Sequence, residues 1–106
     1  MLVTTTAVLD GIPVARYLGV VTGETIMGVN IFKDWAAGWR NMVGGRAEGY
    51  EEEIRKAKDI AMQEMLQRAQ ELGANAVIGV AFDYQSIGSD GSNMMMVGVS
   101  GTAVQV

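Results

Sequence analysis

The sequence predicts a small α+β fold in which antiparallel strands form a sheet and pack against one long and one short helix, in a β-β-α-α-β-β order. The prediction depends on three observations: one long segment with helical periodicity, extended runs on both sides of it, and glycine-rich turns between the segments. A length of 106 residues is typical of one domain with a limited core, so residues 1–106 are expected to form a single domain.

The long helix is expected from Glu48 to Leu72. Apolar residues recur there at helical spacing, which places them on one face of a helix with about 3.6 residues per turn. They are Ile54, Ala57, Ala61, Met65, Ala69 and Leu72. On the outer face, ion pairs with the acid four residues ahead of the base are expected for Glu51–Arg55, Glu52–Lys56 and Glu64–Arg68. Gly73 is expected to end the helix in the left-handed conformation.

Three further elements are expected before the long helix. Residues Leu2–Leu9 are rich in β-branched side chains and predict an N-terminal strand. A second strand is expected over Arg16–Ile26, where strict alternation places Leu18 and Val21 on opposite faces. Residues 30–43 predict the short helix, because large apolar residues recur there at helical spacing. These residues are Phe32, Trp35, Trp39 and Met42.

The last part of the chain predicts an antiparallel hairpin. Its strands cover Ala74–Gln85 and Met94–Val106, and turn-forming residues 88–93 join them. Strict alternation places one bulky set of side chains on a single face of the first strand: Ala76, Ile78, Val80, Phe82 and Tyr84. The second strand is apolar on both faces. The two sets are Met95, Val97, Val99 and Ala103 on one face, and Met94, Met96, Val104 and Val106 on the other.

Self-association is expected because one long helix covers only one face of this apolar sheet. A contiguous apolar surface that remains uncovered usually marks an interface, and a closed symmetric ring leaves no edge strand open. The partner is therefore expected to be the protein itself, as a homo-oligomer. Replacing Val97 or Val99 by aspartate is expected to dissociate or unfold this assembly.

Composition excludes several classes of partner. A formal net charge of -4 argues against nucleic acid, which requires clustered Lys and Arg. No apolar run approaches the about 20 residues that span a bilayer, and the N-terminus has no basic stretch followed by an apolar core. We therefore expect no membrane association and a cytoplasmic location. The chain has no cysteine, which excludes disulfide bonds.

Five segments cover nearly the whole chain and carry a family resemblance. They are YLGVVTGE (17–24), NIFKDWAAGWRNMVGGR (30–46), YEEEIRKAKDIAMQEM (50–65), LGANAVIGVAFDY (72–84) and VSGTAVQV (99–106). In this combination they resemble the bacterial YbjQ-like family, which also carries a heavy-metal-binding label. The resemblance implies a dodecin-like α+β subunit that assembles as a pentameric ring, in a family whose biochemical function is uncharacterised. The chain has neither Cys nor His, so a metal site built from those ligands cannot be carried over.

Two groups of residues near the start of the long helix are candidate sites. Glu48, Glu51 and Glu52 offer oxygen ligands to a hard cation such as calcium or magnesium, although acidic residues also stabilise a first helical turn by themselves. Gly45, Arg46 and Tyr50 are the candidates for binding a small ligand, because backbone N–H groups and a guanidinium ahead of a helix can hold an anion. A simple turn between two helices is the alternative for this second group.

The sequence therefore predicts a non-enzymatic oligomeric module that binds a small ligand or metal ion at subunit interfaces. The alternative is a carboxylate-dependent, metal-assisted enzyme at the subunit junction. Glu24 and Asp83 are examples of carboxylates for such a junction, but nothing in their spacing singles them out. A purely structural ring is a third interpretation. No catalytic residue is assigned, because no histidine is present to activate a serine. The cofactor is unknown: a divalent metal ion remains open, and no haem or nucleotide motif is present.

Overall fold

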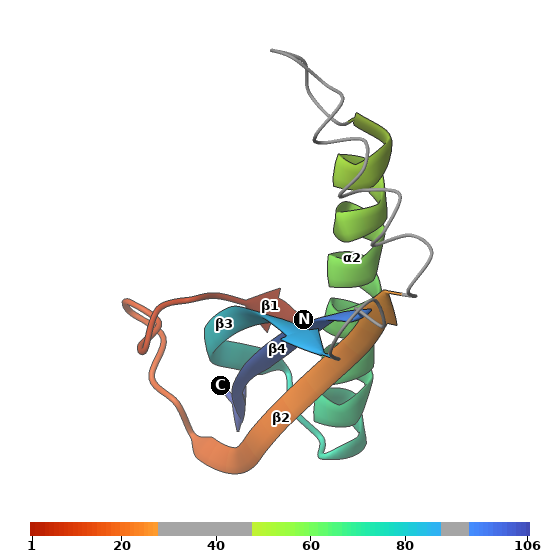
Figure 1. The fold of residues 1–106 in the computed structure, drawn as a ribbon. Coiled ribbons are helices and arrows are strands. Elements are labelled where there is room, and N and C mark those ends of the chain that lie inside the picture. Colours follow the sequence, from red (N-terminus) through yellow and green to blue (C-terminus); the bar gives the residue numbers. More distant parts are fainter. Residues whose placement is uncertain (28–47, 88–93) are drawn as a thin grey trace.

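One long helix packs across a four-stranded sheet (Figure 1). The computed structural model describes residues 1–27, 48–87 and 94–106, and the side chains of residues 48–50 and 87 are not described. The strands are β1 (Leu2–Val3), β2 (Arg16–Met27), β3 (Ala76–Ile87) and β4 (Met94–Gln105), in the spatial order β1-β3-β4-β2. The helix is α2 (Glu48–Glu71). The predicted short helix over residues 30–43 lies outside the described residues.

The helix α2 starts at the predicted residue and ends one residue earlier than predicted. Four residues of the predicted apolar face are at most 2% exposed: Ala57, Ala61, Met65 and Ala69. Ile54 is half-buried beside them, which confirms most of the face. Leu72 is 47% exposed, so the prediction that it is buried is wrong. The reason is that it follows the last helical residue, where the chain already turns away.

Gly73 ends the helix in the way the sequence predicts. Its φ is 86°, in the left-handed region that glycine adopts without strain. The Gly73 N–H donates to the Gln70 carbonyl at 2.9 Å, and the Ala74 N–H donates to the Ala69 carbonyl at 3.0 Å. These two bonds satisfy the last helical carbonyls in a Schellman motif, and the chain then enters β3.

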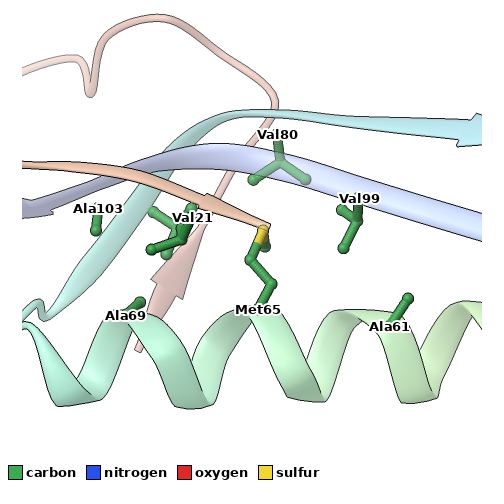
Figure 2. Packing of buried hydrophobic residues seen from close by; sticks show 8 residues of the cluster. Val21, Ala61, Met65, Ala69, Val80, Val99 and Ala103 are labelled. Carbon is green, nitrogen blue, oxygen red and sulfur yellow. The ribbon is translucent and has the colours of Figure 1, made fainter. Parts of the chain in front are cut away.

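The closest approach of helix and sheet is at Gly23 of β2. A Cβ atom at this position would overlap the Ala61 carbonyl oxygen and lie 2.9 Å from the Met65 amide nitrogen. Met65 is fully buried, and its side chain points from α2 into the sheet toward Val21, Val80 and Val99 (Figure 2). Small residues on both elements therefore bring the backbones together, and one flexible methionine fills the remaining space.

The β3–β4 pairing is antiparallel, which confirms the predicted hairpin, but the strict alternation predicted for β3 is wrong. The register shifts between Ile78 and Ala81, where Gly79 has a φ of 62°. This β-bulge adds one residue, so Ile78 lies away from the helix while Val80 packs toward it. A second register shift follows Tyr17 in β2. It places Leu18 and Val21 against the same cluster, whereas alternation predicted opposite faces.

The N-terminal strand is shorter than predicted and makes the sheet mixed rather than antiparallel. The strand β1 contains only Leu2–Val3 and pairs in parallel with β3. Beyond it, the Thr4 N–H donates to the Val77 carbonyl at 3.0 Å, and the Gly79 N–H donates to the Thr6 carbonyl at 2.8 Å. The chain then crosses the sheet face opposite to α2, where Leu9 and Val14 pack on a small cluster. The cluster consists of Ala76, Ile78 and Val104.

Replacing Gly73 by Val is expected to destabilise the protein by more than about 1 kcal/mol, because a β-branched residue is strained at positive φ. The Gly73→Asn variant is the matched control, since asparagine tolerates the left-handed conformation, and its loss is expected to be smaller. Chemical denaturation measures both. Equal denaturation midpoints for the wild type and the Val variant would contradict the expected backbone strain at residue 73.

Replacing Gly23 by Ala is expected to destabilise the protein by about 1 to 3 kcal/mol, because the added methyl overlaps helix backbone that cannot rotate away. Gly98→Ala is the control: a Cβ at this neighbouring-strand position lies 3.8 Å from the Asp83 carbonyl oxygen, an ordinary contact. Its expected change is within about 0.5 kcal/mol. Thermal melts of the two variants, run in parallel, measure the loss of stability of each. Similar losses of stability for Gly23→Ala and Gly98→Ala would refute the close approach.

Candidate functional site

The sheet face opposite to α2 is only partly covered, and its uncovered part is called the open face below. It begins beyond the cluster that Leu9 and Val14 cover. On β2, Val20 is 77% exposed and Ile26 is 55% exposed. The register places these residues on this face: Val20, Thr22, Glu24 and Ile26 from β2, Met96, Gly98 and Ser100 from β4, and Ala81, Asp83 and Gln85 from β3.

A hollow of about 210 Å³ lies in the middle of the open face. Its floor is low because three small residues meet there, namely Ala81, Gly98 and Ser100. Larger side chains surround the floor: Thr22, Glu24, Asp83 and Met96. The hollow is thus polar on two sides, where the carboxylates stand, and apolar at the methionine.

The two carboxylates of the hollow stand in one row across the sheet. Gly98 of β4 pairs with Glu24 of β2 on one side and with Asp83 of β3 on the other. The two acidic residues are therefore two strand spacings apart, roughly 10 Å between Cα atoms. Glycine places no side chain between them. Glu24 and Asp83 are the carboxylates that the sequence suggested for a metal-assisted enzyme, and the sheet brings them to one site.

Each carboxylate already has a partner within the protein. The Arg68 Nη1 atom lies 3.3 Å from Glu24 Oε2, and Gln85 Nε2 donates to Asp83 Oδ2 at 3.4 Å. The side chains of Arg68 and Glu24 are 44% and 45% exposed, so water screens this ion pair. A cation that enters the hollow would compete with Arg68 for Glu24. Asp83 has a single long hydrogen bond to the described residues, so a cation reaches it more easily.

Most of the residues predicted from the sequence as sites lie where the structure does not describe their side chains. Gly45 and Arg46 lie outside the described residues, and Glu48 and Tyr50 belong to the first turn of α2, where side chains are not described. Glu51 is half-buried, and Glu52 is exposed. Across residues 1–27, 48–87 and 94–106, no three acidic, His or Cys side chains gather as metal ligands. The glutamate metal site and the anion site remain predictions.

Sequence reasoning missed the hollow itself, because the hollow depends on the register of three strands. Thr22 and Ser100 are ordinary strand residues in the sequence, and only the pairing of β2 with β4 sets them opposite each other. Sequence reasoning also missed the contribution of Arg68 to the site, because the helical spacing predicted only an ion pair between Arg68 and Glu64. That pair is confirmed, and the same guanidinium also reaches β2.

Within the described residues, one helix on a mixed four-stranded sheet defines a small two-layer α+β protein, and this fold occurs among solved structures. A protein of unknown function from Pediococcus pentosaceus ATCC 25745, assigned to the DUF74 family, matches with a TM-score of 0.67. The match covers 100% of this chain and 97% of that chain at 18% identity, which shows a shared fold. No helix within the described ranges is long and apolar enough to cross a membrane.

The family follows from the sequence comparisons. A family model described as "Putative heavy-metal-binding" matches residues 1–106. A "UPF0145 protein" from Bifidobacterium longum (strain DJO10A) is 54% identical over 106 residues, which are 100% of this chain and 96% of that protein. The chain belongs to the YbjQ family, which confirms the resemblance of its segments; the family is uncharacterised.

The residues of this chain do not fit a soft heavy metal. Without Cys or His, its only sulfur donors are methionine thioethers. Met95 packs with Val97 on the helix side of β4, whereas Met96 lines the hollow on the opposite face. Neighbouring methionines of this strand therefore cannot converge on one ion within a subunit. The hollow offers two carboxylates, two hydroxyls and one thioether, a set that suits hard cations better.

Dialysis of the purified protein against zinc or cadmium, followed by desalting and elemental analysis, is expected to leave no stoichiometric ion on the chain. The physical reason is that neither thiolate nor imidazole is available as a ligand. The Gly98→Cys variant, which adds a thiol beside Glu24 and Asp83, is the comparison and is expected to retain more metal. One ion per wild-type chain after desalting would contradict the expectation.

Proposed function

We propose that the protein is a non-enzymatic homo-oligomeric module in which neighbouring copies cover the open face and enclose the hollow as a binding pocket. The observation that carries the proposal is the exposure of Val20 and Ile26, which are 77% and 55% exposed at the two ends of one strand face. Burying each of these side chains against a neighbour contributes about 1.5 to 3 kcal/mol. The sequence resemblance adds the expectation that the assembly is a pentameric ring.

The size of the hollow supports a pocket shared between copies. Ligand pockets in proteins usually measure about 300 to 1,000 Å³ and bury most of the ligand. At about 210 Å³, the hollow of a single protomer is smaller than this. A neighbouring copy that covers the open face would deepen it and exclude water. The ligand site would then exist only in the assembly.

The charges of the hollow select the kind of ligand. Glu24 and Asp83 supply two negative charges, and Thr22 and Ser100 supply hydroxyl groups that both donate and accept hydrogen bonds. Arg68 offsets one of the two charges. The site therefore suits a small organic cation or a hard divalent ion, and it disfavours an anion.

A second candidate function is a carboxylate-dependent, metal-assisted enzyme at the subunit junction. The row formed by Glu24, Gly98 and Asp83 favours it, because two carboxylates on one face can hold a hard cation such as magnesium. The pair with Arg68 weighs against it, since that pair occupies one of the two ligands. A bound divalent ion whose removal by EDTA abolishes turnover would favour this enzyme over a binding module.

Replacing Ile26 or Val20 by Asp is expected to dissociate the assembly into folded protomers, because an unpaired charge in an apolar interface costs several kcal/mol. Val97 and Val99, which the sequence suggested for this test, are 0% and 3% exposed beneath α2, so aspartate there would unfold the protomer instead. Sedimentation velocity gives the mass and circular dichroism reports folding. Gln67→Asp on the exposed helix surface is the charge-matched control. A folded wild-type monomer at micromolar concentration would refute the proposal.

Native mass spectrometry of freshly purified protein is expected to show an oligomer that carries an additional small mass. The Asp83→Asn variant removes one charge from the hollow and leaves the apolar contacts in place, so it should lose the extra mass and keep the oligomer. Asp59→Asn, on the exposed helix surface, is the control and should retain both. An oligomer that never retains a small mass would support a purely structural ring instead.

A further inference from the structure

The strand β2 forms one edge of the sheet, and it has the properties of an edge that pairs with other chains. It is 12 residues long, and among the described strands it pairs only with β4. Several of its residues are β-branched, and two of these, Val20 and Ile26, are exposed. Long exposed edges of this kind are templates for pairing with strands of other molecules, and native proteins protect them.

The geometry of Arg68 shows which backbone groups of β2 face outward. The Arg68 Nη1 atom donates to the Thr22 carbonyl oxygen at 2.7 Å. In an antiparallel ladder both backbone groups of one residue point to the same side and alternate along the strand. The N–H and C=O groups of Thr22 therefore point away from β4. Those of Val20, Glu24 and Ile26 follow the same alternation.

The side chain of Arg68 extends from α2, past the outer side of β2, toward residues of the open face. The helix α2 covers one face of the sheet, whereas Thr22 and Glu24 belong to the open face. From Arg68, Nη1 also contacts Thr22 Oγ1 and Glu24 Oε2, each at 3.3 Å. The second guanidinium nitrogen binds Glu64 one turn earlier on α2. The guanidinium is thus held from the helix and lies against the outward backbone at the centre of β2.

We propose that Arg68 closes the β2 edge against pairing with β2 of a second copy of this chain. An antiparallel two-fold pairing centred on Gly23 would set Val20 opposite Ile26 of the other copy and Thr22 opposite Glu24. All four residues have outward backbone groups, and the exposed apolar side chains would meet. Thr22 and Glu24 are the central positions of this register. They are also the two residues that Arg68 contacts.

The carbonyl contact distinguishes this role from an ordinary surface ion pair. Exposed ion pairs contribute little to stability, and a lysine would replace the charge equally well. The planar guanidinium, however, binds the backbone carbonyl and two carboxylates at once, which one ammonium group cannot do in this geometry. Arg68→Lys therefore keeps the charge and the stem and loses the closure of the edge.

Sedimentation velocity over a concentration series tests the proposal on the full chain. Arg68→Ala is expected to form species larger than those of the wild type, with a fraction that rises severalfold with concentration. Adding Val20→Lys to this variant should remove the larger species, so that the double variant sediments like Val20→Lys alone, because an exposed lysine protects an edge strand. Arg55→Ala, a loss of charge elsewhere on α2, should match the wild type. Arg68→Lys carries the same test if the alanine variant does not fold.

Hydrogen exchange at the same concentrations locates the new contact. In the larger species the amides of Thr22 and Glu24 should become protected relative to the wild type. A folded variant that sediments like the wild type would overturn the proposal, as would new protection confined to strands other than β2. The variant is compared with the wild type, whatever the oligomeric state of the wild type is. A monomeric wild type would therefore refute the proposed oligomer and leave this inference standing.

Discussion

The close approach of α2 to β2 at Gly23 determines most of the remaining structure. Because Ala61 and Gly23 have little or no side chain, the helix axis lies near the β2 side of the sheet, and Met65 fills the space toward β3 and β4. The same placement leaves the helix-facing end of β3 only partly covered, where Phe82 and Tyr84 are 36% and 44% exposed. It also sets Arg68, about two helical turns beyond Ala61, beside the sheet edge.

The two faces of the sheet therefore differ in how completely they are covered. The β4 residues Val97, Val99 and Ala103 are almost fully buried under α2, so the hydrophobic core on the helix side is complete within one protomer. On the opposite face the N-terminal segment covers only the cluster around Ile78, through Leu9 and Val14. What remains is the open face, where small residues at the centre leave a hollow between two carboxylates. The chemistry of that hollow follows from strand register and not from any local motif.

Local features of the sequence predict the helix well. Its period, and Gly73 at its end, depend on short-range geometry, so α2 differs from the prediction by one residue at its end. One ion pair differs, because Lys56 pairs with Glu53 at 3.5 Å where Glu52 was predicted. The apolar faces of β4 are also predicted correctly, since that strand has no bulge among its paired residues.

The sheet is harder to predict because one inserted residue reverses every later side chain. Several glycines of the chain could adopt positive φ, and the bulge at Gly79 is accompanied by a hydrogen bond from its N–H to the carbonyl of Thr6, far away in sequence. Strict alternation therefore places Phe82 beside Ile78, whereas the bulge turns it to the helix side, where Lys58 lies 5.1 Å from its ring. The same shift places Asp83 on the open face, in line with Glu24. The candidate site could not be assembled from the sequence without this bulge.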